Sequence, residues 1–461
     1  MSSKFDFSKF LFYAVSIAAA LVLIFAAGFY SGVNKTFVYT AVMWMEKAVK
    51  ETFWESPTLL KIRPEHFLQP AHYQGSGVTV NNVHDREEQV VFMSGFFNNT
   101  NELRLIRRNG DIVARWPVQF SKIFPNPTHL PEPPKTNWNV DTHGALALPD
   151  GSVVFNFEYS GLVKLDRCDR VVWTLARMTT HSVERAEGGG FWVPGRRYYP
   201  PAAPSPFPSF PTPFYEDTIM KVSEEGKVIK EISVPQLFYD NGMEPLLTIM
   251  ALRGLQLMKL RGTPVAVELS HMNKIEELTR DMAVDFPMFK AGDLMLSDRQ
   301  RNLIMVIDPD AGKVKWWRVG PWIRQHDPEF VPGGKIIVFN NNNYRTAFPT
   351  GDDITPISPP RYSNIMEYDF ASDRYRIIYG DKPGQEFWSI VAGQVRRTST
   401  GGLLITEFEG GRIFETDAEG RVVWEYINRY SPKEVSEITG ARLYPASYFR
   451  VPDWSCERIG G

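Results

Sequence analysis

Apolar and polar positions alternate along most of this chain in pairs of short segments that flank a polar turn and often end in Trp. Such a pair predicts a β-hairpin. Spread over roughly 350 residues, six hairpins leave about 60 residues each, which suits a repeating unit of four strands plus loops. The pattern therefore predicts an all-β fold, a six-bladed β-propeller over residues 77–430, with residues 431–461 as a C-terminal segment that closes the ring. The six hairpins cover residues 103–116, 162–175, 219–232, 304–317, 365–378 and 412–426.

Two insertions interrupt the repeat. Residues 198–214 are too rich in proline for a strand interior, and they predict an extended loop over one face of the propeller, either an exposed spacer or a lid. Residues 245–260 have apolar positions at helical spacing, which predicts a helix across the edge of a blade.

The N-terminal segment has the composition of a membrane span. Residues 10–33 carry no charge. This uncharged stretch is long enough to cross roughly 30 Å of hydrocarbon as a helix. Lys4 and Lys9 precede this stretch and favour a cytoplasmic N-terminus, residues 1–9, with the propeller on the extracytoplasmic (periplasmic) side. We expect a single-pass signal anchor followed by a juxtamembrane segment, residues 34–76; a signal peptide cleaved near Ala26 is the alternative.

The charge balance and the cysteine content bear on three features, namely nucleic-acid binding, a disulfide and a zinc site. Lys and Arg total 51 against 53 for Asp and Glu, so the balance gives no reason to expect nucleic acid. The chain has two cysteines, Cys168 and Cys456, and outside the cytoplasm they could form a disulfide, although two unrelated thiols are equally compatible with the sequence. Without a CxxC or a Cys/His cluster of ligand spacing, we expect no zinc site.

A histidine recurs about eight residues before a glycine-bearing turn and a short apolar strand. A residue that opens each repeat of a closed ring lies near the axis of the ring. The pattern therefore predicts a cluster of imidazoles in a central channel, whereas a single histidine in a β protein is more often an ordinary hydrogen-bonded core residue. The recurring residues are His143, His181 and His326, with His271 as a fourth copy whose turn is delayed by an insertion.

Further polar residues accompany the histidines. Asn273 lies two positions after His271, Arg299 follows the strand that ends at Ser297, and the strand after His326 ends in four asparagines, residues 340–343. Imidazoles, a guanidinium and amides suit a tetrahedral, multiply charged oxyanion. No Asp/Glu pair recurs with them, and no GxSxG or P-loop motif occurs, which argues against a glycosidase, a serine hydrolase and a nucleotide enzyme.

Over roughly residues 77–450 the chain resembles the bacterial arylsulfotransferases, propeller enzymes that move a sulfuryl group between phenols through a sulfated histidine. The resemblance rests on HSVERAEGGGFWV, SHMNKIEEL, LMLSDRQRNLIMVID, RQHDPEFVPGGKIIVFNNN and GGRIFETDAEGRVVWEY. It implies a phenolic sulfate donor, a phenolic acceptor and no cofactor.

Residue roles follow from the same resemblance. His326 would be the nucleophile, and His271, Asn273 and Arg299 would hold the sulfuryl oxygens. His181 would complete this cage or serve the phenol oxygen. Three further residues would bind substrate: His143, Asn340 and Gln394. Gln394 stands where the characterised enzymes have a threonine in the last blade.

The same residues are compatible with a second function. A non-catalytic propeller could use inward-facing histidines to bind a ligand, a metal or a protein partner in its channel, since neutral imidazole suits zinc or copper. Labelling of a histidine by an aryl sulfate would distinguish the enzyme from the binding module.

Overall fold

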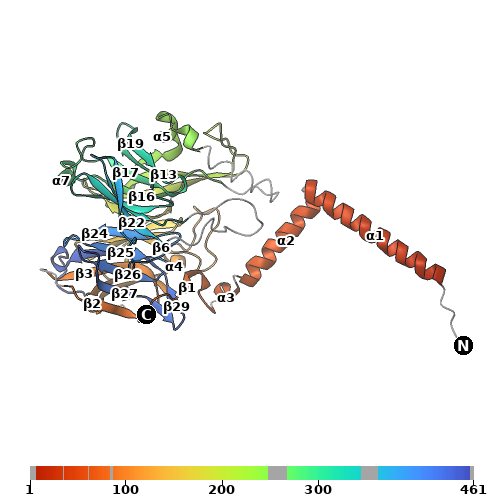
Figure 1. Cartoon of the computed structure of the whole chain (residues 1–461), viewed down its shortest axis with the longest axis horizontal. Coiled ribbons are helices and arrows are strands. Elements are labelled where there is room, and N and C mark those ends of the chain that lie inside the picture. The colour runs from red at the N-terminus through yellow and green to blue at the C-terminus, as the bar shows by residue number, and fades with distance from the viewer. Residues whose placement is uncertain are drawn as a thin grey trace.

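The computed structural model describes residues 7–34, 36–54, 56–60, 62–83, 87–247, 267–343 and 362–456. Two helices, α1 (Phe7–Asn34) and α2 (Phe37–Trp54), project from a body made of β-sheets (Figure 1). In the described residues, α1 is the one helix whose length and apolar composition would allow it to cross a membrane. The expected span of residues 10–33 lies within it. The sequence interpretation assigned no helix to the juxtamembrane segment, where the structure has α2.

The body contains six sheets of four or more strands within the described ranges, and their neighbouring strands are antiparallel except for the short parallel pair of β13 and β15. We number the sheets by the chain order of their first hairpins. Sheets 1 to 3 consist of the following strands: β30 (Ile438–Pro445), β3 (Gln89–Phe97), β4 (Thr100–Arg107) and β5 (Ile112–Val118); β6 (Thr142–Ala147), β7 (Val153–Phe157), β8 (Gly161–Leu165) and β9 (Val171–Leu175); β10 (Met178–Thr179), β11 (Glu184–Arg185), β12 (Phe191–Tyr199), β13 (Phe214–Val222), β14 (Val228–Ser233) and β15 (Val267–Glu268).

Sheets 4 to 6 repeat the arrangement. Their strands are β16 (Met272–Glu277), β17 (Leu294–Asp298), β18 (Leu303–Asp308) and β19 (Lys313–Val319); β20 (His326–Val331), β21 (Lys335–Asn340), β22 (Asn364–Asp369) and β23 (Arg374–Tyr379); β24 (Gln394–Arg397), β25 (Leu403–Glu407), β26 (Arg412–Thr416), β27 (Val422–Ile427) and β2 (Gly77–Asn81). All six hairpins expected from the sequence are present as the third and fourth strands of these sheets.

Short elements complete the described structure. A small sheet joins three strands from the two ends of the β region: β1 (Leu68–Pro70), β28 (Arg429–Ser431) and β29 (Glu434–Ser436). The short helices are α3 (Ser56–Leu59), η1 (Glu65–Phe67), α4 (Phe120–Ile123), α5 (Val234–Asp240), α7 (Arg280–Ala283), η2 (Arg299–Arg301) and η3 (Ala446–Tyr448).

Each sheet contacts the next along the chain, and strands from the two ends of the β region belong to the first and last sheets. Strand β30 follows sheet 6 in the sequence but pairs with β3 from Gln89↔Pro445 to Gly95↔Ile438, so the C-terminal segment supplies the first strand of sheet 1. At the other end, β2 pairs with β27 of sheet 6. The C-terminal segment thus contributes a strand to sheet 1, and the N-terminal strand β2 contributes one to sheet 6.

The recurrent Trp of the hairpins links neighbouring sheets. Trp116 on β5 is fully buried, and its indole Nε1 donates to the Asp166 carbonyl in sheet 2 at 2.9 Å. Trp173 and Trp424 make the equivalent bond to the next sheet, each at 2.8 Å. A large apolar ring with one polar donor suits this position, because the ring fills the space between two sheets while its N–H is satisfied by the neighbouring turn.

The proline-rich insertion is a loop between β12 and β13, and its aromatic residues are buried. Phe207 and Phe210 are 3% and 4% exposed, and Phe207 stacks on Tyr239 of α5 with 5.9 Å between ring centroids. This burial does not fit an exposed spacer. Of the second insertion, residues 248–260 lie outside the described residues.

Antiparallel order gives the body two distinct faces. The starts of the first strands and the turns between second and third strands lie on one face, which we call the upper face. The turns between first and second strands, and between third and fourth, lie on the opposite, lower face.

Candidate active site

The four recurring histidines all lie at the upper end of first strands. His143 is in β6, His271 directly precedes β16, and His326 opens β20, while His181 lies between β10 and β11. The ring centroid of His181 is 4.5 Å from that of His143, 4.8 Å from that of His271 and 6.4 Å from that of His326. Four sheets thus bring together residues that are up to 183 positions apart in sequence.

Hydrogen bonds fix the tautomers of two of these rings. The His271 Nδ1 is 3.0 Å from a Glu268 carboxylate oxygen, which can only accept, and 3.4 Å from an Arg299 guanidinium nitrogen, which can only donate. The shorter contact, to Glu268, favours the tautomer with the proton on Nδ1. Its Nε2 is then an acceptor for the His181 Nε2–H at 3.2 Å, and the hydroxyl of Thr180 donates to His181 Nδ1 at 2.8 Å. Both imidazoles are neutral in this arrangement.

The tautomer of His326 is fixed by Asn341. Both amide hydrogens of Asn341 are used, because its Nδ2 lies 2.8 Å from the carbonyl oxygens of Ser389 and Ala392. Its Oδ1 must therefore accept from the His326 Nδ1–H, 2.6 Å away. This bond leaves the lone pair of His326 on Nε2.

Several buried polar atoms around His326 have no hydrogen-bond partner among the described residues. Unsatisfied buried polar atoms are uncommon in folded proteins, and a group of them in one place indicates a site for a polar ligand. They include His326 Nε2, Arg299 Nε, Asn273 Oδ1 and His143 Nδ1. The amide of Asn273 is held beside the His326 strand, since its Nδ2 donates to the Gln325 carbonyl at 2.7 Å.

Burial keeps the histidines neutral. It lowers the pKa of His143 and of His271 to about 4, and the charge of Arg299 contributes in the same direction. The pKa values of His181 and His326 also lie well below the usual value, again through burial first, with Arg299 as a further cause. An imidazole that stays neutral near pH 7 keeps a lone pair for nucleophilic attack.

Two residues expected at the substrate make other contacts. The Asn340 Oδ1 accepts from the Ile323 amide at 2.7 Å, and the Gln394 Oε1 accepts from the Ala441 amide at 3.2 Å. Neighbouring residues of a strand point to opposite sides, so it is Asn341, not Asn340, that reaches His326.

Glu158, in the turn between β7 and β8, was not predicted from the sequence. One carboxylate oxygen of Glu158 and one ring nitrogen each of His143 and His181 all lie within 4.8 Å of one another, a spacing that could also hold a metal ion. Burial, together with the nearby charge of Asp141, raises the pKa of Glu158 to about 7. A short turn without any repeated pattern gives no sequence signal for such a residue.

A network of buried ion pairs lies further along the first strands, toward the lower face. The Lys274 Nζ is fully buried and is 2.7 Å from Glu184 Oε1 and 2.8 Å from Asp327 Oδ1. Arg396 and Arg442 also contact Glu184, at 3.1 and 2.9 Å. Although burial opposes ionisation, these cations hold the pKa of Glu184 well below its usual value. The network joins the first strands of sheets 1, 3, 4, 5 and 6 below the histidines.

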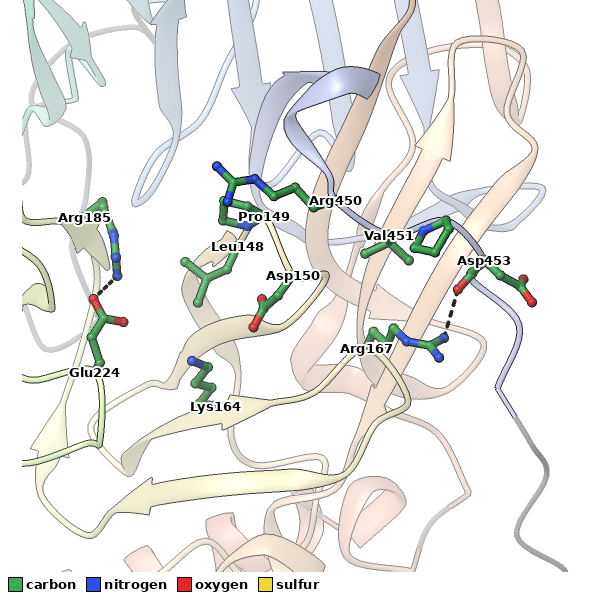
Figure 2. Close-up of a pocket in the computed structure, with 11 residues that line it drawn as sticks. Leu148, Pro149, Asp150, Lys164, Arg167, Arg185, Glu224, Arg450, Val451 and Asp453 are labelled. Carbon is green, nitrogen blue, oxygen red and sulfur yellow. Dashed lines mark hydrogen bonds and ion pairs between the residues drawn. The ribbon is translucent and has the colours of Figure 1, made fainter.

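A cavity of about 430 Å³ lies on the lower face and contains none of the histidines (Figure 2). Arg167 lies at its edge and donates to the carbonyls of Asp453 and Ser455 at 3.0 and 2.8 Å. Cys168 and Cys456 are joined by a disulfide next to these contacts. The C-terminal tail is thereby attached to sheet 2.

The sequence model of the arylsulfotransferase (ASST) family matches residues 144–429, which include His181, His271, Asn273, Arg299 and His326. The chain belongs to the arylsulfotransferase family. No curated protein matches it at a significant level.

The solved structures to which this arylsulfotransferase family member is similar share little sequence with it. A Bacteroides caccae protein of unknown function is 14% identical, with a TM-score of 0.44 over 74% of this chain and 93% of that one. The virginiamycin B lyase of Staphylococcus aureus is 11% identical, with a TM-score of 0.38 over 79% and 88%. The β-propeller domain of Cps50 (Swd1) from Myceliophteria thermophila is 8% identical, with a TM-score of 0.40 over 77% and 91%.

Proposed function

We propose that the protein is a membrane-anchored aryl sulfotransferase that carries the sulfuryl group on His326 between a phenolic sulfate donor and a phenolic acceptor. The observation that carries this proposal is the fixed tautomer of His326, whose unpartnered Nε2 holds a lone pair among other unsatisfied polar atoms. Membership of the arylsulfotransferase family supports the same chemistry.

The reaction has two half-reactions. His326 Nε2 attacks the sulfur of the aryl sulfate, the N–S bond forms as the S–O bond to the aryl group breaks, and the phenolate leaves with a proton. The acceptor phenol then loses its proton and attacks the same sulfur, which breaks the N–S bond and restores neutral His326. Glu158 is suited to give the first proton and take the second, because its pKa of about 7 lies near the operating pH.

Arg299 is suited to stabilise charge on the sulfuryl oxygens, because its unsatisfied Nε is a charged donor. Asn273 can add the second hydrogen of its Nδ2, whose first goes to the Gln325 carbonyl, while its unsatisfied Oδ1 can only accept. His271 is held by Glu268, and His181 is held by Thr180, so that neither ring needs to reorganise during the reaction. His143 contributes a further unpartnered nitrogen, while Asn340 and Gln394 keep the surrounding backbone in place.

The proposal includes the architecture around the site. The contacts between successive sheets, with β30 completing sheet 1 and β2 extending sheet 6, support a closed six-bladed propeller over residues 77–430 and 438–445. The apolar helix α1 supports a single-pass anchor with the propeller on the extracytoplasmic side, where the disulfide would be stable.

Labelling by an aryl sulfate tests the function. The full chain is incubated with p-nitrophenyl sulfate with and without phenol, nitrophenolate release is followed by absorbance, and peptides are examined by mass spectrometry for a sulfuryl group on His326. We expect His326→Ala to abolish label and release, and Arg299→Lys to lower release by about 100-fold, since a point charge cannot replace the planar fork. His72→Ala, at an exposed position, serves as the control and should remain active. A folded wild-type protein that is never labelled by any of several donors would refute the proposal.

Metal binding is the second candidate function, favoured by the spacing of His143, Glu158 and His181. Protein purified without a histidine tag would then contain zinc or copper in a stoichiometric amount. Loss of that metal in Glu158→Gln, together with no labelling of His326, would favour this function over sulfuryl transfer.

A further inference from the structure

Helix α2 carries an apolar stripe that no described residue covers. Val38, Val42, Met45 and Val49 follow one another at spacings of four, three and four residues, so they lie on one face of the helix. Their exposed fractions are 60%, 59%, 63% and 49%. Such a stripe on an isolated helix is unfavourable in water and indicates a contact surface.

The position of α2 relative to α1 identifies the surface that the stripe contacts. Helix α1 has 28 residues, about 42 Å at 1.5 Å per residue, which exceeds the hydrocarbon thickness. It ends at Asn34, and α2 begins at Phe37, so α2 starts where the span leaves the membrane. In Figure 1, α1 and the sheets lie on opposite sides of α2. A helix with an exposed apolar face at this point fits the surface of the bilayer.

The segment after α2 attaches to the upper face, where the histidines lie. His66 Nε2 is 2.8 Å from Asp141 Oδ1, two positions before His143, and Gln69 Nε2 donates to Glu437 Oε1 at 2.8 Å. The Tyr73 hydroxyl donates to the Glu407 carboxylate at 2.8 Å. The ring of Phe67 stacks on Phe96 with 3.9 Å between centroids. The chain is therefore fixed to the upper face from His66 onward, 12 residues after the end of α2.

We propose that α2 lies in the bilayer surface with this stripe in the lipid, that the upper face is turned toward the membrane, and that the acceptor is an amphiphilic phenol with an apolar tail drawn from the bilayer. This inference rests on the proposed function, and it specifies the class of acceptor. A phenol with a long alkyl chain concentrates in the membrane, because each CH₂ of the chain is buried in hydrocarbon, so a site that faces the lipid meets far more of it than a site that faces water.

Site-directed spin labelling tests the position of α2. Both native cysteines are in the disulfide, so a cysteine introduced at one position can be labelled alone. The full chain is reconstituted in phosphatidylcholine vesicles with the label at Met45→Cys or, on the adjacent face, Glu46→Cys. We expect the label at position 45 to be more accessible to oxygen and less accessible to a nickel chelate than the label at position 46. Equal accessibility at the two positions would overturn the inference.

Acceptor selectivity tests the orientation of the site. In vesicles, kcat/KM is measured for p-octylphenol and for p-cresol with the wild type, with Val42→Glu/Met45→Glu and with the matched control Val42→Leu/Met45→Leu. We expect the glutamate pair to lower the preference for p-octylphenol by about tenfold or more, the leucine pair to retain it, and p-cresol turnover to be the same in all three. An unchanged preference in the glutamate pair would overturn the inference while leaving the proposed function intact. If p-cresol is not sulfated at all, the proposed function fails, and the spin labels still decide where α2 lies.

Discussion

Lys274 provides the sharpest test of how the first strands are held together. Its ammonium group is fully buried and contacts the carboxylates of Glu184 and Asp327, which belong to two other sheets. The substitution Lys274→Met keeps most of the side-chain volume and removes the charge. Two buried carboxylates then lose one shared cation.

The expected cost follows from the remaining partners. Breaking a buried ion pair from one side typically costs about 3 to 5 kcal/mol, because an uncompensated charge stays buried. Glu184 keeps Arg396 and Arg442, whereas the nearest remaining cation to Asp327 is Arg396 at 4.0 Å. We therefore expect a loss near the lower end, about 3 kcal/mol, against a total stability of about 5 to 15 kcal/mol.

Urea unfolding of the full chain in detergent, followed by tryptophan fluorescence, measures this loss. The control is Lys313→Met, at an exposed position at the start of β19, where the same substitution should leave the midpoint within experimental error. If both lysine variants unfold at the same urea concentration at pH 8, the network does not hold the sheets together.

Three further outcomes follow from the site. Although burial opposes it, the bond to Asp141 raises the pKa of His66 to about 9, so its stabilisation is complete below about pH 6.5 and lost as the pH rises through 9. Since 46% of the His66 side chain is exposed, His66→Gln should cost only about 1 kcal/mol in urea unfolding at pH 6 and nothing at pH 10; equal losses would contradict this. Glu158→Gln should remove the inflection near pH 7 from the pH profile of kcat/KM, and an unchanged profile would exclude Glu158 as the proton carrier. Asn341→Leu should lower kcat by about 10 to 100-fold with KM unchanged, because His326 loses the acceptor that fixes its tautomer; unimpaired turnover would show that Asn341 has no positioning role.

Local patterns in the sequence were sufficient to predict the hairpins and the apolar helix α1. Each of the six hairpins depends on alternation and a turn within about 15 residues, and each is present. The helix α1 depends on one uncharged run. The convergence of the histidines could be predicted because a repeat places equivalent residues at equivalent points of neighbouring sheets.

Other features depend on contacts that no local pattern encodes. The sequence offered four consecutive asparagines, and only the strand direction in space decides that the second of them, Asn341, reaches His326. Glu158 gains its role from a turn that approaches His143 from another part of the sheet. The partners of Lys274 are 90 and 53 positions away, so the buried network is invisible in any short window.

The upper and lower parts of the first strands meet opposite demands. At the upper end, the candidate chemistry needs polar atoms without partners, since a sulfuryl group can bind only where His326 Nε2 and Arg299 Nε are not already satisfied. Each such atom lowers the stability of the folded chain. A few residues further along, the ammonium group of Lys274 and the carboxylate of Glu184 each lie beside groups of opposite charge. Because His326 and Asn273 directly precede Asp327 and Lys274 on β20 and β16, the satisfied network can keep these strands in register while the atoms above it stay open. Loosening the network by Lys274→Met should therefore impair sulfuryl transfer as well as stability.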